Sequence, residues 1–341
     1  GKSTLGSVGV NWITGFEYFS ELTDFRNWDT NNRVRSGLVE DRGFELQSFS
    51  GFGQVEFDIN PYFRPTIGLR YDAYDGHLEI RDPGNLNEKK PLNNLSHVSP
   101  KFGFRSTWFE GFDFKANVSN GFALPGGSIR YNSDANVDPS EVWQYEAGVE
   151  YDYKNLVKVN LTGFILETSK EVNETILGSG VFVNSGKTQR HGLELGIRAQ
   201  PVRRLNFNGS FAYIRTEIKK NVDEALVGKE LNNIPRTVTN LMLDYTLESG
   251  LGARVNYRNV GKYATGLENF FYYNGYSRTD ATLFFNFAGT SSKRGQLFVE
   301  FNNIFNENYA TYVFDNGGPS DGQSYSASAP RNFSIGVSYN F

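Results

Sequence analysis

The last ten residues of the chain alternate between apolar and small polar side chains without a break. Successive side chains of a β-strand point to opposite faces, so the large apolar residues share one face and asparagine, serine and glycine share the other. Such a strand at the end of a chain frays unless it is held in a sheet. The segment therefore predicts the closing strand of a membrane β-barrel, with an apolar face made of Phe333, Ile335, Val337, Tyr339 and Phe341.

Strand-like segments recur along the whole chain, and the connections between them alternate between short turns and long polar loops. This alternation is typical of bacterial outer-membrane barrels, and it predicts an all-β fold of fourteen antiparallel transmembrane strands. The predicted strands are 5–19, 44–58, 63–80, 97–108, 112–122, 141–153, 157–170, 187–200, 204–218, 236–247, 251–263, 277–288, 295–305 and 331–341. The predicted long loops are 20–43, 81–96, 123–140, 171–186, 219–235, 264–276 and 306–330.

Charged residues in these segments keep to one face. From residue 143 to residue 153 every apolar residue is odd-numbered and every charge is even-numbered, and 193–200 follow the same rule. In 101–108 the two faces are again separate, with the large apolar residues even-numbered and the charges odd-numbered. A charge turned to lipid at mid-bilayer would cost roughly 2–4 kcal/mol, which this arrangement avoids. An aromatic girdle is expected at the strand ends. Its predicted members are Trp108, Phe112, Phe114, Tyr151 and Tyr153.

Composition narrows the class of protein further. The 29 Phe and 19 Tyr suit strands and lipid interfaces. The net charge of −4, with both signs interspersed, argues against a nucleic acid partner, and the absence of cysteine excludes disulfides and thiolate metal sites. Mean hydropathy is −0.47 and no apolar run is long enough for a transmembrane helix. A barrel stays compatible with this value because its inner face is polar.

Two alternatives make geometric predictions. A soluble β protein, such as a carbohydrate-binding sandwich, would turn the apolar face of 141–153 into its interior. A complete fourteen-stranded passive channel would pair strand 5–19 with strand 331–341, because a closed barrel has no free edge.

Several short motifs resemble those of the TonB-dependent outer-membrane receptors. Leu297 to Tyr309 resembles the penultimate strand of that family, in which an apolar strand runs into Asn, Phe, Asn and Tyr. Ala329-Pro330-Arg331-Asn332-Phe333 and the strand after it resemble the family's final signature. The likeness is specific over 97–341 and generic over 1–96. The other similar motifs are Ser99-Pro100-Lys101-Phe102-Gly103, Ser119-Asn120-Gly121-Phe122, Trp143-Gln144-Tyr145-Glu146-Ala147-Gly148, Asn184-Ser185-Gly186-Lys187, His191-Gly192-Leu193-Glu194 and Ile234-Pro235-Arg236.

The resemblance implies a receptor in the outer membrane of a Gram-negative bacterium, surrounded by lipid and driven by the TonB complex. Members of the family have an amino-terminal plug domain and a barrel of 22 strands. Because this sequence shows fourteen strands and no plug, residues 1–341 are expected to be the carboxy-terminal part of such a barrel. TonB would then act through a plug that is not in this sequence. The implied substrate is a ferric siderophore, with haem, cobalamin and oligosaccharide left open.

Catalytic and metal chemistry find no support in the sequence. His77, His97 and His191 have no partner at metal-ligand spacing, and neither Glu40-Asp41 nor Asp321 lies in a calcium-loop pattern. Gly178-Ser179-Gly180 lacks the lysine and helix of a phosphate loop. No Ser-His-Asp arrangement can be argued. The sequence therefore predicts a protein that is not an enzyme and needs no cofactor.

Substrate binding is expected in the long loops, since loops on a rigid scaffold carry recognition. Arginine and aromatic side chains suit anionic ligands with flat aromatic faces. The same side chains could instead stiffen the loops, and the resemblance implies that loops 123–140 and 171–186 fold over substrate. The candidate binding residues are Arg33, Arg35, Arg130, Tyr131, Phe271, Tyr272, Tyr273 and Tyr312, with Phe270 and Phe314 beside them.

Overall fold

The computed structural model describes residues 1–84, 86–92, 95–124, 137–174, 182–288, 294–315, 320 and 322–340. Antiparallel strands dominate these residues, and a 3-10 helix, η2 (Glu224–Leu226), lies after β11. No helix in the described ranges is long and apolar enough to cross a membrane. The strands are β1 (Lys2–Leu5), β2 (Val8–Asn31), β3 (Val34–Asp58), β4 (Arg64–Ile80), β5 (Glu88–Pro91), β6 (Leu95–Phe109), β7 (Phe112–Ala123), β8 (Ser140–Tyr153), β9 (Val157–Glu174), β10 (Phe182–Val202), β11 (Leu205–Lys220), β12 (Thr237–Thr246), β13 (Leu251–Val260), β14 (Tyr263–Ala264), β15 (Tyr272–Tyr273), β16 (Tyr276–Ala288), β17 (Arg294–Asn302), β18 (Ala310–Asp315), β19 (Gln323–Ala327) and β20 (Asn332–Asn340).

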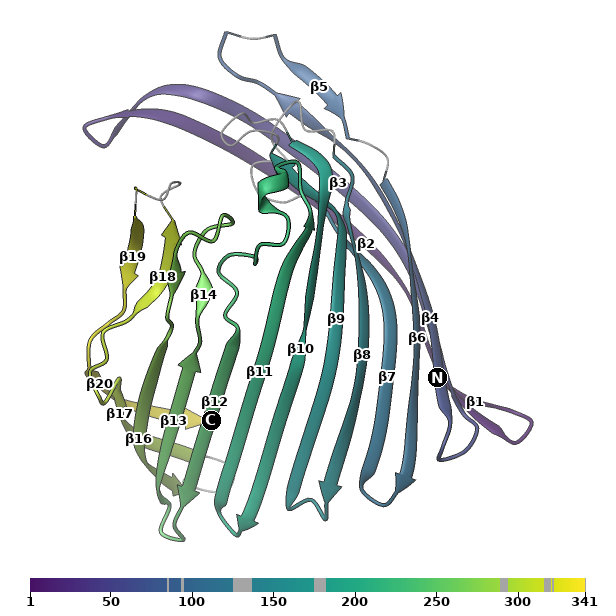
Figure 1. Cartoon of the computed structure of the whole chain (residues 1–341), viewed down its shortest axis with the longest axis vertical. Coiled ribbons are helices and arrows are strands. Elements are labelled where there is room, and N and C mark those ends of the chain that lie inside the picture. The colour runs from purple at the N-terminus through teal and green to yellow at the C-terminus, as the bar shows by residue number, and fades with distance from the viewer. Residues whose placement is uncertain are drawn as a thin grey trace.

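One curved sheet of sixteen strands makes up the body of the molecule, and its long strands lie side by side as a wall (Figure 1). The path of hydrogen-bonded neighbours is β1-β2-β3-β4-β6-β7-β8-β9-β10-β11-β12-β13-β16-β17-β20, and β5 pairs with β4 off this path. All fourteen predicted strands are present in it. The path is open, because β20 pairs with β17 but with neither β1 nor β2 in the described residues. The edge pairing that a complete fourteen-stranded channel requires is therefore not found there.

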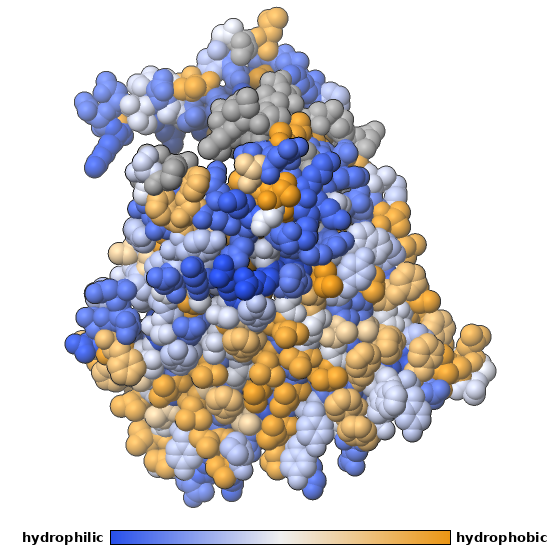
Figure 2. Space-filling view, viewed as in Figure 1, coloured by the Kyte–Doolittle hydropathy of each residue, from blue (hydrophilic) through white to orange (hydrophobic). Residues whose placement is uncertain are grey.

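The outer face of the wall is apolar, as predicted. In β8, Trp143, Tyr145, Tyr151 and Tyr153 are each more than a third exposed, while the intervening polar residues lie on the other face. Apolar residues gather over the lower part of the long strands and polar residues above them (Figure 2). A soluble β protein would bury its apolar face. An apolar face turned outward is instead expected of strands in contact with lipid.

Strand β20 carries the same outer face to the end of the sheet. Phe333, Ile335 and Val337 are 66–73% exposed. Its ladder with β17 sets Phe333 opposite Phe301 and Val337 opposite Leu297, so apolar side chains meet across the strands. The amphipathic pattern of the last strand is confirmed for the residues described, and Phe341 lies outside them.

Charges on the inner face are largely paired. Glu150 of β8 accepts from Lys115 of β7 and from Lys158 of β9, both at 2.8 Å. Arg105 of β6 pairs with Asp113 of β7. The predicted separation of charges from the apolar face is thus confirmed, and the ion pairs hold neighbouring strands together across the inner face.

The lower rim is built of short turns, as predicted. Lys154 and Asn155 between β8 and β9 both have positive φ, 52° and 59°, as in the hairpin turns that match strand twist. Gly111 between β6 and β7 has φ +78°, and a Cβ there would lie 2.2 Å from the Asp152 carbonyl oxygen. A glycine is therefore required where these two turns meet. Trp108, Tyr151 and Tyr153 lie exposed beside them, where the girdle was expected.

The prediction of an irregular loop over 20–43 is wrong. Strand β2 continues to Asn31 and β3 begins at Val34, and they are joined by Asn32 and Arg33, whose positive φ values of 50° and 67° form a tight turn. The pairing of β3 with β4 begins at Arg42, so from Val34 to Glu40 β3 pairs with β2 alone. Residues 27–40 therefore form a two-stranded extension, the β2–β3 arm. The arm bends over the upper end of the molecule in Figure 1.

Other predicted loops also contain strand residues, and within 171–186 β9 continues to Glu174 and β10 begins at Phe182. Strand β5 lies within 81–96, β14 and β15 pair within the connection 261–275, and β18 and β19 pair within 303–331. These short hairpins stand above the wall at its upper end (Figure 1). The alternation of short and long connections is confirmed, but the long ones are partly ordered by their own backbone hydrogen bonds.

Candidate substrate-binding surface

Tyrosines from the last two long connections meet at the upper end of β12–β17. Tyr263 and Tyr273 lie edge to face with ring centroids 5.5 Å apart, and Tyr276 and Tyr309 stack at 4.2 Å. Burial and the neighbouring phenols of Tyr273, Tyr276 and Tyr312 raise the pKa of Tyr263. We call Tyr263, Tyr272, Tyr273, Tyr276 and Tyr309 the tyrosine cluster. Its edge-to-face and stacked pairs are geometries that stabilise aromatic groups.

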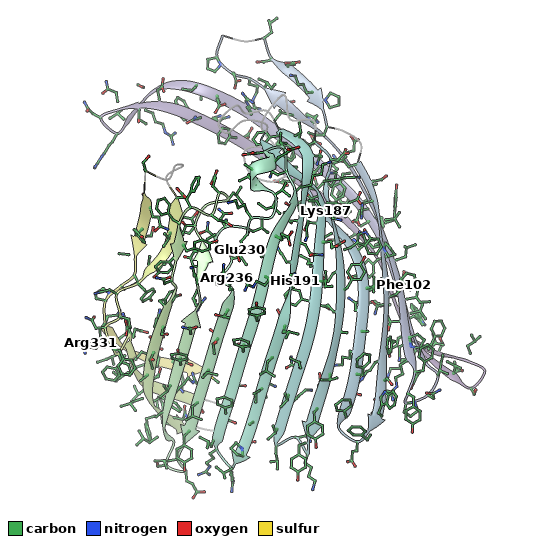
Figure 3. The ribbon with its side chains drawn as sticks, viewed as in Figure 1. Phe102, Lys187, His191, Glu230, Arg236 and Arg331 are labelled. Carbon is green, nitrogen blue, oxygen red and sulfur yellow. The ribbon has the colours of Figure 1, made fainter. Side chains whose placement is uncertain are left out.

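Two cations cover the ring of Tyr272. The Lys262 ammonium lies 4.4 Å and the Arg236 guanidinium 5.6 Å from the ring centroid. Arg236 is also held by Glu230 at 2.8 Å, and Arg215 pairs with the same carboxylate at 3.2 Å. Figure 3 shows Glu230 and Arg236 together above the wall. Two guanidinium groups share the Glu230 carboxylate and Lys262 adds a third positive charge over Tyr272, beside rings that can stack on a flat ligand.

Asn269 helps to join the loops that carry these groups, together with backbone hydrogen bonds from Asn233 to Ala264 and from Arg236 to Lys262. The Asn269 amide donates to the carbonyls of Glu230 (2.9 Å), Gly266 (3.0 Å) and Leu267 (3.1 Å), and its oxygen accepts from the Glu230 N–H at 2.7 Å. Asn269 has φ 56°, a conformation that asparagine tolerates better than most residues. The segments 221–236 and 261–275 are therefore fixed relative to one another.

The last connection is attached to the same unit. The Ala310 N–H donates to the Tyr273 hydroxyl at 3.0 Å, and the Gln323 amide donates to the Thr265 hydroxyl at 2.8 Å. Val313 between them is fully buried. Three long connections thus form one braced surface around the tyrosine cluster.

The candidates from the sequence have different surroundings. Tyr272, Tyr273 and Tyr312 lie in or beside the tyrosine cluster. The Phe271 carbonyl accepts from the Thr265 N–H at 3.1 Å, and the adjacent Phe270 is half exposed.

Arg33 and Arg35 lie on the β2–β3 arm instead. Both are exposed, and the Arg35 guanidinium lies 5.5 Å over the Trp28 ring. In the described residues neither contacts the tyrosine cluster. Arg130 and Tyr131, and the Phe314 side chain, lie outside the described residues, as do large parts of loops 123–140 and 171–186.

The sequence did not indicate most of the residues that form this surface. Arg236, Lys262 and Tyr263 fall inside the predicted strands 236–247 and 251–263, and Tyr276 and Tyr309 lie near the ends of the predicted loops 264–276 and 306–330. The available signal was the bunching of Lys262-Tyr263 and Tyr272-Tyr273-Tyr276 on both sides of one loop. Only the fold shows that these positions meet Tyr309 from a third segment.

No group of three His, Cys, Asp or Glu side chains in the described residues is arranged to hold a metal ion. His77 lies 3.5 Å from Glu45 and 3.6 Å from Glu79, and His97 contacts the Asn120 amide oxygen at 2.6 Å.

Known proteins share both sequence and fold with this chain. The family model described as TonB dependent receptor-like, beta-barrel, matches residues 1–304. The metal-pseudopaline receptor CntO of Pseudomonas aeruginosa is 26% identical over 298 residues, which cover 84% of this chain and 40% of that protein.

Two solved structures have the same fold. The siderophore receptor PiuA from Acinetobacter baumannii superposes with a TM-score of 0.82 at 16% identity, covering 99% of this chain and 54% of that one. The ferric citrate transporter FecA gives 0.81 at 17%, covering 99% and 53%. The chain therefore spans about half the length of the solved structures that it matches.

Proposed function

The chain belongs to the TonB-dependent receptor family, as part of its β-barrel, and from this premise we propose that it forms the substrate-binding wall of an active nutrient importer. The family consists of outer-membrane β-barrel proteins of Gram-negative bacteria. Its relatives and structural neighbours are receptors and transporters, not enzymes. The apolar band of the outer face would contact lipid, and the upper loops would face the exterior.

The observation that carries the proposal is the convergence of three connections on the tyrosine cluster. Recognition surfaces combine rigid aromatic groups with a few well-placed cations, and here Tyr272, Lys262 and Arg236 supply both. The other predicted candidates, Arg33, Arg35, Arg130, Tyr131 and Phe271, would extend the surface if the loops close over a ligand.

A ferric siderophore is the substrate that we propose. Siderophore complexes are often anionic with flat aromatic or amide faces, which suits cations beside exposed rings. The names of the relatives, a metal-pseudopaline receptor and a siderophore receptor, agree with this choice.

We further propose that residues 1–341 form the carboxy-terminal part of a 22-stranded barrel. The open path of the sheet needs further strands to close it, and the solved structures that it matches are about twice as long. The TonB complex would then act through a plug domain elsewhere in the receptor.

Uptake of radiolabelled ferric siderophore by iron-starved cells that lack the chromosomal gene tests this function. The full-length receptor carrying Lys262→Gln and Tyr272→Ala is expected to need about tenfold more substrate for half-maximal uptake, because a charged contact and a stacking face are lost. Antibody labelling of whole cells would check that surface abundance is unchanged.

Tyr62→Ala is the matched control, since Tyr62 is an exposed tyrosine in a short turn at the opposite rim. It should transport like the wild type. Unchanged uptake in the Lys262/Tyr272 variant would exclude the tyrosine cluster as the binding surface. Unchanged uptake in the deletion strain itself would exclude the siderophore as substrate.

A further inference from the structure

The upper ends of β8, β9 and β10 are fastened together by the side chain of Asn184. Its amide oxygen accepts from the Asp138 N–H at 2.6 Å, and its nitrogen donates to the carbonyls of Asp138 and Lys170, both at 2.8 Å. Asp138 precedes β8 and Lys170 belongs to β9, so one side chain of β10 holds both neighbours. The junction lies beside Lys187, at the upper end of the wall in Figure 3.

The ladder between β9 and β10 is irregular at this point. Its register shifts between Asn184 and Gly186 and again between Gly186 and Lys187, and Lys170 has φ 54°, a conformation uncommon for lysine. Such an irregularity releases backbone groups from the ladder. The Lys170 carbonyl accepts from the Asn184 amide and from the Ser140 hydroxyl, the latter at 3.2 Å. A carbonyl of β9 is thus bonded by side chains of both neighbouring strands.

The start of β8 is held at the same place by two further contacts. Val137 is buried, and the Lys170 ammonium lies 2.6 Å from the Glu141 carboxylate. Both charged side chains are about a third to a half exposed, and ion pairs of this exposure contribute little. The three hydrogen bonds of Asn184 are therefore the main fastening of this junction.

Asn184 repeats the bonding pattern of Asn269. Each carboxamide accepts from the N–H and donates to the C=O of one residue in another long connection, Asp138 for Asn184 and Glu230 for Asn269. Each also donates to a carbonyl of its own hairpin or connection. A carboxamide has both a donor and an acceptor, so it can pair with both groups of a backbone residue at once. The same device braces two different pairs of connections.

We propose that Asn184 is a positioning residue for substrate capture. It joins the bases of connections 123–140 and 171–186, which are residues 137–141 on one side and 168–174 with 182–187 on the other, into one unit. Connections that are already fixed lose little entropy when a ligand binds, so a joined pair binds more tightly than two independent ones. The role in capture rests on the proposed function, whereas the joint itself does not.

Uptake kinetics of the full-length receptor separate capture from transport. Asn184→Ala should raise the concentration of the imported ferric siderophore that gives half-maximal uptake by about fivefold, because the two connections must then be ordered at the moment of binding. The maximal rate should stay unchanged. Hydrogen exchange of the purified variant should become faster in residues 137–141 and in residues 168–174 together. Antibody labelling of whole cells would check that surface abundance is equal.

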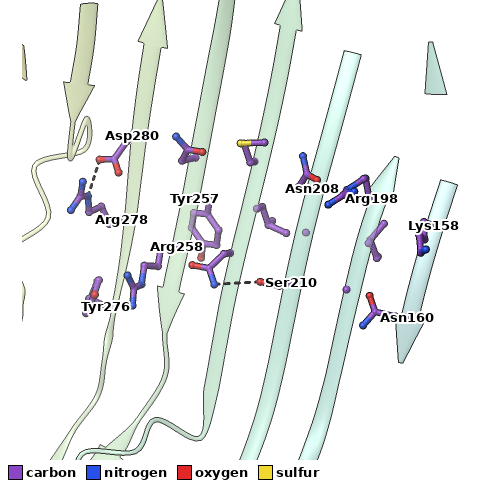
Figure 4. A pocket seen from close by; sticks show the side chains of 17 residues that line it. Lys158, Asn160, Arg198, Asn208, Ser210, Tyr257, Arg258, Tyr276, Arg278 and Asp280 are labelled. Atoms are coloured by element: carbon purple, nitrogen blue, oxygen red, sulfur yellow. Dashed lines mark hydrogen bonds and ion pairs between the residues drawn. The ribbon is translucent and has the colours of Figure 1, made fainter. Parts of the chain in front are cut away.

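Asn240→Ala is the matched control. Asn240 lines a recess of the inner wall, where its amide makes one contact of 3.4 Å with the Ser210 hydroxyl (Figure 4). This variant should leave uptake and exchange unchanged. Lys170→Gln removes the ion pair with Glu141 but keeps the carbonyl that Asn184 binds, so it should change exchange much less than Asn184→Ala.

A second substitution at the same position covers the case in which the alanine variant fails to reach the surface. Asn184→Asp has nearly the same size and keeps an acceptor oxygen, but it loses both amide donors. It should therefore raise the half-maximal concentration and speed the exchange of both segments as Asn184→Ala does.

Three results would overturn the proposal. Faster exchange in one segment alone would mean that Asn184 does not join the two. Faster exchange with an unchanged half-maximal concentration would limit Asn184 to a structural role. A fall in the maximal rate alone would assign its effect to transport instead of capture. A wild-type receptor that imports no ferric siderophore would overturn the proposed function and with it the role in capture, while hydrogen exchange would still decide whether the two bases are joined.

Discussion

The β2–β3 arm and the tyrosine cluster both present cations beside aromatic rings at the loop end of the sheet, but they are built differently. The arm is one hairpin, in which Arg35 of β3 covers Trp28 of β2, seven residues away in the chain. The tyrosine cluster joins three connections through Asn269, the Tyr273 hydroxyl and Gln323. The same residue types thus form a free-standing extension in one place and a braced surface in the other.

This difference shows why bracing matters for recognition. A group that is already fixed loses little entropy when a ligand binds, whereas an exposed side chain on a two-stranded extension must be ordered at the moment of binding. The tyrosine cluster is therefore the stronger candidate for specific contacts, and the arm is better suited to a first encounter with a ligand.

The largest expected effect comes from removing the brace. Asn269→Ala deletes four hydrogen bonds and should lower the local stability of segments 221–236 and 261–275 by about 2–3 kcal/mol. Hydrogen exchange of the two segments would measure this. Asn27→Ala in the arm is the control, because that amide makes one 3.4 Å contact with Glu40 and its loss should change little. Equal effects in the two variants would contradict the distinction between the regions.

Acid should loosen the base of the arm before it affects the tyrosine cluster. Burial acts to raise the pKa of Asp41, but hydrogen bonds from Arg26 and Arg81 outweigh it and hold that pKa below the ordinary value of 3.8. The stabilisation is therefore complete above about pH 3.8 and is lost as the pH falls through the lowered pKa. Tyr263 behaves oppositely, since its raised pKa makes its contribution fail only at alkaline pH.

Hydrogen exchange at the arm base, corrected for intrinsic rates, would follow the acid transition, and Asp41→Asn should remove it. An acid transition that persists in this variant would assign the effect to another group.

The smallest effect is expected at the arm tip. Arg35→Ala removes an exposed cation–π contact with Trp28 and should change the local stability by at most about 1 kcal/mol. Exchange rates of residues 27–40 would measure it. A larger change would mean that the arm is held by contacts beyond its own two strands.

The wall could be predicted from the sequence because lipid contact imposes a strict alternation. Segments such as β8 and β20 have one face in lipid and one in water, so the apolar or polar character of each residue indicates the face on which it lies. The arm could not be predicted in this way. Above the bilayer both faces of a strand meet water, so a strand there has no apolar face. The mixed charges of 20–43 therefore resemble those of a loop, although β2 and β3 stay paired as far as Asn31 and Val34.

Only part of the candidate substrate-binding surface was predicted from the sequence. Tyr272, Tyr273 and Tyr312 were found because aromatic residues in polar loops stand out. Tyr309, Tyr276 and Arg236 lie in or next to strand motifs, where the same residues satisfy the wall pattern and give no separate signal.

By itself, the sequence determined the strands, their faces, the alternation of turns and loops, and the family that they resemble. These follow from local periodicity, which each segment carries independently of the others. The tertiary structure alone decided that the sheet is an open arc, that residues 27–40 form an arm, and that tyrosines of three segments meet. Such relations depend on strand register and long-range hydrogen bonds, which join residues far apart in the chain and leave no periodic trace in it.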